Sequence, residues 1–231
     1  MIVSRRKEIV FRFVLFWVRR ALRKHFHAIH LEGLEHLQAV PLSQPVIIVA
    51  NHHTWWDGFF AALLAGETPL RKYHVVQEER HLQRYLFFRY AGVFGIDLSR
   101  PAASLPGLRH ALQILAQPRN VVWIFPEGLL TSPTAPFQIR GGAELLAKKS
   151  GAAILPCYLR VAGRGESRPA ALIRLGAPIP AKQIGATLEE MRRATHDFED
   201  PQREWPHPPL LRGRSSINRV WDAVTGQTPS L

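Results

Sequence analysis

Cysteine is almost absent from this sequence of 231 residues, in which Cys157 is the sole example. A single cysteine cannot form an intramolecular disulfide and provides no cysteine cluster for zinc. His74, His81 and His110 are scattered without metal-ligand spacing, and we expect neither a metal nor any other cofactor. The sequence also lacks a Gly-x-Ser-x-Gly elbow, a P-loop and a His-Glu-x-x-His motif, which leaves serine hydrolase, NTPase and zinc protease activities without support.

Long apolar runs and acidic residues are missing from the N-terminal region. The apolar run at residues 13–18 is far shorter than the ~20 residues of a spanning helix, and Arg19 and Arg20 follow it too closely for a cleaved signal peptide. Residues 1–30 carry eight Lys or Arg side chains against the single Glu8, interleaved with Phe, Trp, Val, Ile and Leu. This pattern predicts a basic amphipathic helix that lies in the headgroup region of an anionic membrane.

The basic region is also compatible with two roles away from a membrane. The helix could simply cover the hydrophobic core, and the overall charge of +12 could serve nucleic-acid binding, although no nucleic-acid-binding module accompanies it. We expect a peripheral protein on the cytoplasmic face of the cell membrane, with an anionic membrane surface as a partner and no nucleic acid.

Apolar strand patterns alternate with helical patterns through the rest of the chain. We expect strands at residues 45–50, 73–77, 93–98, 120–125, 152–160 and 171–175, and helices at residues 54–64, 79–90, 104–116, 142–150 and 188–198. Near-continuous apolar strands separated by helices indicate an α/β fold with a mixed, mostly parallel sheet flanked by helices. Residues 161–169 read as a hairpin loop.

We predict three regions along the chain. They are an amphipathic interfacial helix region at residues 1–30, an αβ domain at residues 31–200 and a Pro-rich C-terminal extension at residues 201–231. The extension is expected to begin as an irregular linker at residues 201–213 and to contain a short helix at residues 217–224.

A polar segment follows the apolar strand at residues 46–50. It reads Asn-His-His-Thr-Trp-Trp-Asp over residues 51–57 and places His52 five residues before Asp57. A histidine titrates near neutral pH and can take a proton from a hydroxyl, while a carboxylate can fix its tautomer and stabilise the imidazolium. Glu127 follows the strand at residues 120–125, and ligands of such sheets bind beyond the carboxyl ends of the strands.

Three features leave these assignments open. His53 lies four residues before Asp57, so a helix would place His53 and Asp57 on one face. Thr54 and Asp57 also have the spacing of a capping box that starts a helix, and Glu127 could be only an acidic residue at a helix N-terminus.

Four blocks of sequence together resemble the glycerolipid acyltransferase family, the glycerol-3-phosphate and lysophosphatidate acyltransferases. The blocks are Asn-His-x-x-x-x-Asp at residues 51–57, Gly-Val-Phe-Gly-Ile-Asp at 92–97, Phe-Pro-Glu-Gly at 125–128 and Ile-Leu-Pro at 154–156. The resemblance implies an αβ domain with a membrane-docking N-terminal helix. It also implies transfer of a fatty acyl group from acyl-CoA or acyl-carrier protein to a hydroxyl of a lysophospholipid such as 1-acylglycerol-3-phosphate, in phospholipid synthesis or remodelling.

By this resemblance His52 is the general base and Asp57 its partner. The residues expected to bind substrate are Asn51, Arg100, Glu127, Gly128 and Arg140. Backbone N–H groups at Gly128 or at a helix N-terminus are expected to stabilise the oxyanion.

The sequence departs from the family pattern at two phosphate-binding positions. Leucine, which donates no hydrogen bond, stands at Leu98 and Leu130 where the family usually has arginine. Arg100, Arg140 or Lys148 could compensate for the missing arginines. The alternative functions are O-acylation of a glycolipid or glycosylated isoprenoid, or membrane binding by a catalytically idle homologue.

Overall fold

The computed structural model describes residues 1–213, and these build one eight-stranded sheet in the order β4-β3-β5-β2-β6-β7-β1-β8. The strands are β1 (Ala28–Glu32), β2 (Val46–Ala50), β3 (Lys72–Glu78), β4 (Val93–Ile96), β5 (Asn120–Ile124), β6 (Ala153–Ala162), β7 (Ala170–Leu175) and β8 (Leu211–Arg212). The expected α/β class with a mostly parallel sheet is confirmed, because among the strands of residues 1–213 only β6–β7 and β1–β8 pair antiparallel.

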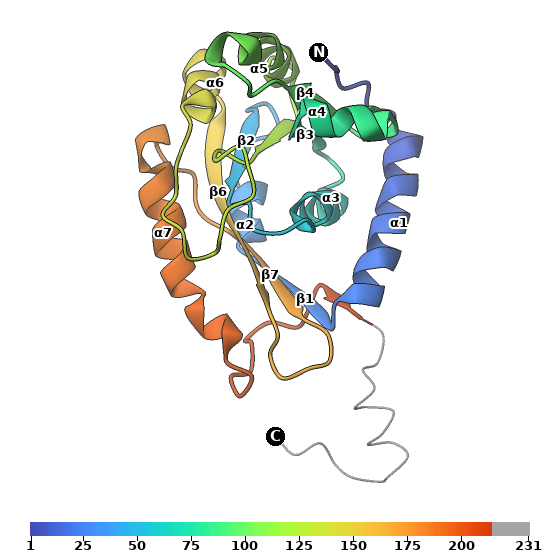
Figure 1. Ribbon diagram of the computed structural model, residues 1–231, viewed down its shortest axis with the longest axis vertical. Coiled ribbons are helices and arrows are strands. Elements are labelled where there is room, and N and C mark those ends of the chain that lie inside the picture. Colours follow the sequence, from blue (N-terminus) through green and yellow to red (C-terminus); the bar gives the residue numbers. More distant parts are fainter. Residues whose placement is uncertain (214–231) are drawn as a thin grey trace.

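Helices connect the strands and cover both faces of the sheet. The α-helices are α1 (Glu8–His25), α2 (Leu34–Gln38), α3 (Asp57–Glu67), α4 (Glu79–Leu82), α5 (Pro101–Leu115), α6 (Gly142–Ser150) and α7 (Ile184–Ala194). The 3-10 helices of the described part of the chain are η1 (Gln83–Tyr90), η2 (Ala181–Gln183) and η3 (His196–Glu199). Figure 1 shows α1 and α3 on one side of the strands and α6 and α7 on the other.

The apolar strands explain this layered arrangement. All five residues of β2 are buried, and successive side chains of a strand point to opposite faces. Ile48 joins the core cluster under α1 and α3, whereas Ile47 and Val49 join the cluster under α5, α6 and α7. β2 therefore lies between two helical layers and needs apolar residues at every position.

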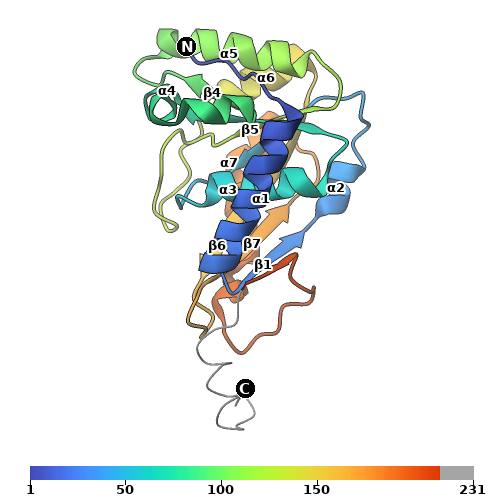
Figure 2. The ribbon, with the colours of Figure 1, turned by 90° about the vertical axis from the view of Figure 1, so that its right-hand side faces the viewer.

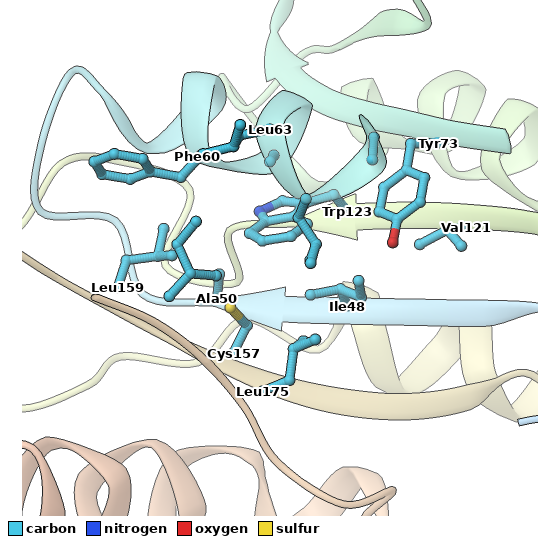
Figure 3. Close-up of a cluster of buried hydrophobic side chains, with 14 of the residues drawn as sticks. Ile48, Ala50, Phe60, Leu63, Tyr73, Val121, Trp123, Cys157, Leu159 and Leu175 are labelled. Carbon is cyan, nitrogen blue, oxygen red and sulfur yellow. The ribbon is translucent and has the colours of Figure 1, made fainter. Parts of the chain in front are cut away.

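The core beneath α3 holds Trp123, the largest fully buried side chain of residues 1–213. Figure 3 shows Trp123 of β5 and Tyr73 of β3 in this cluster, together with Phe60 and Leu63 of α3. Cys157 belongs to the same buried cluster. Its role as a core residue agrees with its place inside an apolar strand, and burial raises the pKa of its thiol.

The N-terminal helix α1 crosses one face of the molecule (Figure 2). Phe11, Val14, Val18 and Leu22 of α1 are buried, so the helix does cover the core. Its outer face exposes large apolar side chains, among them Ile9, Phe13 and Phe16. Within residues 1–213, no helix has the length and apolar character needed to cross a bilayer.

Several elements differ from the expectations. The helix expected at residues 54–64 begins at Asp57, because residues 54–56 form a turn. The helix expected at residues 79–90 is a short α4 followed by η1, with a non-helical backbone at Tyr85 (φ −135°, ψ 47°). The last expected helix, at residues 188–198, is instead α7 and η3.

Strands β1 and β8 and helix α2 were not foreseen. β1 contains His30 and Glu32, which interrupt its apolar pattern, and β8 has only two residues, within the segment expected to be an irregular linker. The hairpin loop expected at residues 161–169 does connect β6 to β7. The expected helix at residues 217–224 lies outside the described residues.

Candidate active site

The site begins where two central strands leave the sheet. β2 and β5 are parallel neighbours, and Val49 pairs with Ile124. The chain after Ala50 and the chain from Phe125 onward therefore emerge side by side at the carboxyl edge of the sheet. This arrangement brings residues 51–57 next to residues 125–128, as their positions in the sequence predict.

His52 and Asp57 form a hydrogen-bonded pair. His52 Nδ1 lies 2.8 Å from Asp57 Oδ2, and the imidazole stacks on Phe125 with ring centroids 4.2 Å apart. An ionised carboxylate can only accept hydrogen bonds, so the shared proton resides on His52 Nδ1. In a neutral imidazole of this tautomer Nε2 carries no proton, as a general base requires.

The Asp57 carboxylate is held by several donors. It is 1% exposed, and its Oδ2 accepts from the backbone N–H groups of His53 at 2.9 Å and Thr54 at 3.0 Å. The Thr54 hydroxyl donates to Oδ1 over 2.6 Å. The Thr54 N–H bond to Asp57 is one half of the expected capping box, so the carboxylate both orders the turn and orients His52.

The neighbouring His53 does not pair with Asp57 through its ring. Its Nδ1 lies 2.9 Å from the side-chain nitrogen of Asn51, and its ring lies against Phe137. Burial lowers the pKa of His53, while Asp57 acts in the opposite direction. The geometry thus favours His52 over His53 as the partner of the carboxylate.

The side chain of Asn51 is completely buried. Its oxygen accepts from the Leu159 N–H over 2.7 Å, and its nitrogen donates to the Leu159 carbonyl over 2.8 Å. The amide therefore fastens the turn at residues 51–56 to β6. Asn51 was expected to bind substrate, but its contacts give it a positioning role.

The Glu127 carboxylate is also buried, with the residue 3% exposed. The Thr131 hydroxyl donates to it over 3.2 Å, and the Thr131 N–H donates to the His52 carbonyl over 2.9 Å. Burial raises the pKa of Glu127, whereas Thr131 and the backbone at His52 act to lower it. Residues 127–131 thus pack against the backbone of His52, a role for Thr131 that no sequence motif indicated.

Gly128 is enclosed between two side chains. Its φ of 75° suits glycine, and a Cβ there would lie 3.1 Å from both Arg140 Nε and Leu98 Cδ1. Arg140 also donates from Nε to the Glu127 carbonyl over 3.1 Å. Leu98 occupies one usual arginine position of the family pattern, so Arg140 places a guanidinium close to where that arginine would lie.

A cavity of about 1500 Å³ opens beside His52. Its lining includes Arg100, Gly128 and Arg140 of the expected binding residues, but not Asn51, Glu127 or Lys148. Most of the remaining wall is apolar and comes from α1, α3, β3 and α5. Small residues on one face of α3 make room for it, and their spacing was visible in the sequence: Gly58, Ala61, Ala62 and Ala65.

Metal-ligating side chains do not gather near this site. Within residues 1–213 no group of three or more His, Cys, Asp or Glu side chains is arranged to hold a metal ion. The arrangement at His52 and Asp57 offers proton transfer beside an apolar cavity with two arginines in its wall.

The chain is similar to known acyltransferases. A family model described as acyltransferase matches residues 28–160. The 1-acyl-sn-glycerol-3-phosphate acyltransferase of Streptococcus pneumoniae (strain ATCC BAA-255 / R6) is 30% identical over 112 residues, which is 48% of this chain and 39% of that protein. The chain therefore matches about two fifths of the length of this relative.

A solved structure shares the fold. The crystal structure of the 1-acyl-sn-glycerophosphate (LPA) acyltransferase PlsC from Thermotoga maritima is similar with a TM-score of 0.52 and 20% sequence identity. The similarity covers 85% of this chain and 81% of that one. At this identity the likeness supports a common architecture.

Proposed function

The chain belongs to the glycerolipid acyltransferase family, and on that premise we propose that it transfers a fatty acyl group from an acyl thioester to a hydroxyl of a lysophospholipid such as 1-acylglycerol-3-phosphate, in phospholipid synthesis or remodelling. The observation that carries this proposal is the His52–Asp57 pair, in which Asp57 engages Nδ1 of a histidine that also lines an apolar cavity. Either acyl-CoA or acyl-carrier protein serves as the donor.

In the proposed reaction His52 Nε2 takes the proton of the acceptor hydroxyl. The hydroxyl oxygen attacks the thioester carbonyl, and a tetrahedral oxyanion forms. Its collapse forms the ester, breaks the carbon–sulfur bond and releases the thiolate, which takes the proton from the imidazolium. Asp57 stabilises the imidazolium during transfer, and general-base catalysis of this kind contributes roughly 10²–10⁴-fold.

The oxyanion needs hydrogen-bond donors that are not already used. The Gly128 N–H donates to the Phe125 carbonyl over 3.0 Å, which argues against Gly128 as that donor. The first N–H groups of an α-helix have no intrahelical partner, and Gly141 and Gly142 at the start of α6 line the cavity. We assign the oxyanion to the start of α6.

Arg140 is the proposed ligand for the phosphate of the acceptor. It lines the cavity and contacts Gly128 opposite Leu98, and a guanidinium can donate two parallel hydrogen bonds to phosphate. Arg100 lines the same cavity at the start of α5. These two arginines support a phosphorylated acceptor despite leucine at positions 98 and 130.

A glycolipid or glycosylated isoprenoid is the second candidate acceptor. The observation in its favour is Leu130, which is 53% exposed and lines the cavity where the family pattern has arginine. An apolar side chain at the cavity wall suits a head group with less charge. A third candidate, an idle membrane-binding homologue, is disfavoured because the His52–Asp57 pair has catalytic geometry.

We further propose that α1 docks on an anionic membrane surface at the cytoplasmic face of the cell membrane. Phe13 and Phe16 on the outer face of α1 are 65% and 69% exposed, and the basic residues of α1 can contact lipid phosphates. Trp17 and Trp55 are also exposed and line the cavity. A lipid acceptor could therefore enter the cavity directly from the bilayer.

A panel of acceptors tests the function. Purified protein receives radiolabelled acyl-CoA or acylated carrier protein with lysophosphatidate, other lysolipids, a glycolipid and a glycosylated isoprenoid. We expect transfer to lysophosphatidate to exceed transfer to the unphosphorylated acceptors. Transfer to the glycolipid alone would replace the proposal with the second candidate, and the absence of transfer from any donor would favour the idle homologue.

An Arg140→Ala variant tests the phosphate contact. Hydrogen bonds to charged groups contribute about 1.5–3 kcal/mol, so kcat/KM for lysophosphatidate should fall by about 10- to 150-fold. Arg140→Lys should recover only part of the loss, because lysine keeps the charge without the planar fork. Arg109→Ala, at an exposed position of α5 outside the cavity, is the matched control.

A further inference from the structure

Residues 125–141, between β5 and α6, form a long loop without a helix or strand. Figure 1 shows this loop beside α7. Loops longer than about 12–15 residues are uncommon in compact domains and are usually functional. The 125–141 loop contains Glu127, Thr131 and Arg140 of the candidate site, so its position decides where these groups lie.

The loop supports His52 through its backbone, because the Thr131 N–H donates to the His52 carbonyl over 2.9 Å. None of residues 132–139, which follow, is buried. Phe137 and Ile139 are partly buried and pack against the core cluster under α5, α6 and α7. Apolar packing therefore holds this segment only weakly, and polar contacts are needed to fix Thr131 in place.

Arg192 of α7 supplies such contacts. Its Nη1 donates to the Pro133 carbonyl over 3.2 Å and to the Ala135 carbonyl over 2.9 Å. Its guanidinium also lies over the Phe137 ring, 5.5 Å from the ring centroid. One side chain of α7 thus engages the 125–141 loop at three positions.

The Arg192 guanidinium is itself held from α7. Its Nη2 donates to Glu189 Oε1, one turn earlier in the helix, over 2.7 Å, and the Arg192 side chain is 20% exposed. Arg193, the next residue, also pairs with Glu189 over 3.4 Å, but its side chain is 78% exposed. The two neighbouring arginines share an ion-pair partner and differ in burial, so Arg193 is a matched control.

Phe137 links Arg192 to the turn that carries His52. The Phe137 ring is nearly parallel to the His53 imidazole, with ring centroids 6.2 Å apart and an angle of 15° between the planes. The loop therefore reaches that turn at two points, through the Thr131 backbone and through the Phe137 ring.

Helix α7 lies beyond residues 28–160, which match the acyltransferase family model. The four sequence blocks that resemble the family end at residue 156. Nothing in those blocks therefore indicates that a residue of α7 acts on the site.

Resting on the proposed function, we propose that Arg192 is a positioning residue for acyl transfer. It holds the 125–141 loop against α7, and the loop in turn fixes the backbone of His52 and the guanidinium of Arg140. A misplacement of about 1 Å can lower a rate by about 100-fold even when the mutation lies far from the chemistry. Loss of the Arg192 contacts should therefore be visible in the kinetics.

An Arg192→Ala variant tests this role. We expect kcat to fall by about 10- to 100-fold and KM for the lysolipid acceptor to rise, because His52 and Arg140 both lose their fixed positions. A variant that had only lost stability would have a smaller folded fraction and an unchanged KM. Arg192→Lys should recover part of the loss, since an ammonium keeps the charge but lacks the planar fork of the guanidinium.

Arg193→Ala removes a positive charge and a Glu189 ion pair from the same helix. It should leave kcat and KM unchanged, and a loss equal to that of Arg192→Ala would overturn the inference. Phe137→Ala breaks the link from the side of the loop and should change kcat and KM in the same direction. It replaces Arg192→Ala if melting shows that the latter does not fold.

A double variant tests whether both side chains act through one loop. Arg192→Ala combined with Phe137→Ala should lower kcat by less than the product of the two single losses, because contacting residues that act together are not additive. Losses that multiply fully would show that the two act independently and would overturn the inference.

Hydrogen exchange tests the loop contacts without turnover. The Thr131 amide should exchange at least about 10-fold faster in Arg192→Ala than in the wild type, because lost hydrogen bonds to a charged donor make the loop easier to open. Arg193→Ala should exchange like the wild type. Unchanged exchange in Arg192→Ala would overturn the inference whether or not the protein is active.

Faster exchange with wild-type kcat and KM would also overturn it, because the position of the loop would then not matter for the reaction. If the wild type transfers no acyl group, the proposed function has failed, and the exchange rates alone decide whether Arg192 holds the loop.

Discussion

Replacing Asp57 with asparagine should remove a charge while the site keeps its shape. Oδ2 of Asp57 accepts from His52 Nδ1 and from the N–H groups of His53 and Thr54, so these three donors should hold the amide oxygen of asparagine in the same place. Its amide nitrogen would then face the Thr54 hydroxyl, which can rotate to accept. The tautomer of His52 should be unchanged.

The expected loss of activity follows from the missing charge. Two unit charges 4 Å apart interact by about 4 kcal/mol at an effective dielectric constant of 20, and this attraction stabilises the imidazolium in the transition state. Its loss corresponds to about 10³-fold in rate. The free energy of unfolding should fall by only about 1–3 kcal/mol, because hydrogen bonds to a charged group become bonds to a neutral one.

The assay follows release of free thiol from the thioester donor in the presence of lysophosphatidate. We expect Asp57→Asn to lower kcat by about 10³-fold, with a KM close to that of the wild type and an unchanged circular dichroism spectrum. A folded variant with activity within about tenfold of the wild type would refute the reasoning. A loss that appears only in KM would assign Asp57 to substrate binding.

The remaining predictions concern stability and membrane binding. Asn51→Ala should lower the free energy of unfolding by about 2–4 kcal/mol, because the buried N–H and carbonyl of Leu159 lose their partners. Denaturant titration measures this change, and Gln44→Ala, at an exposed position, is the control. Burial lowers the pKa of His74 to about 3, so below pH 6.5 the unfolded chain binds a proton that the folded protein excludes. Unfolding free energy should therefore fall by about 2–3 kcal/mol between pH 6.5 and 4.5, and His74→Gln should flatten that slope; an unchanged slope would rule out this histidine as the cause. Phe13→Ser with Phe16→Ser should weaken partitioning to anionic vesicles by about 10²–10⁴-fold, since each inserted phenylalanine contributes about 1.5–3 kcal/mol. Leu70→Ser, at an equally exposed leucine outside the cavity, should leave partitioning unchanged.

Much of the fold could be predicted because its signals are local. The apolar strands β2 and β5 are bounded by turn residues, and such runs form buried strands wherever helices cover both faces. Strand β1 escaped prediction because His30 and Glu32 break its pattern, and its place in the sheet depends on β7, which lies more than a hundred residues away. Pairing between strands so far apart along the chain cannot be predicted from a short window of sequence.

The candidate site, like the fold, could be predicted from the sequence only in part. The pairing of His52 with Asp57 involves five residues of chain and one turn, so the local sequence determines it. The positions of Asn51 and Glu127 in the chain did not reveal their burial. Asn51 points at β6 and not into the cavity because Leu159 of that strand offers it both a donor and an acceptor.

By itself the amino-acid sequence determined the α/β class, the family and the pairing of His52 with Asp57, because each depends on residue types at short and regular spacing. Only the tertiary structure decided that Arg140 lies against Gly128 opposite Leu98, and that residues of α1, α3, β3, α5 and α6 line one cavity beside His52. These features depend on how a long loop and four separate helices pack around the carboxyl edge of the sheet. Packing of that kind is set by the whole chain at once, and no single segment encodes it.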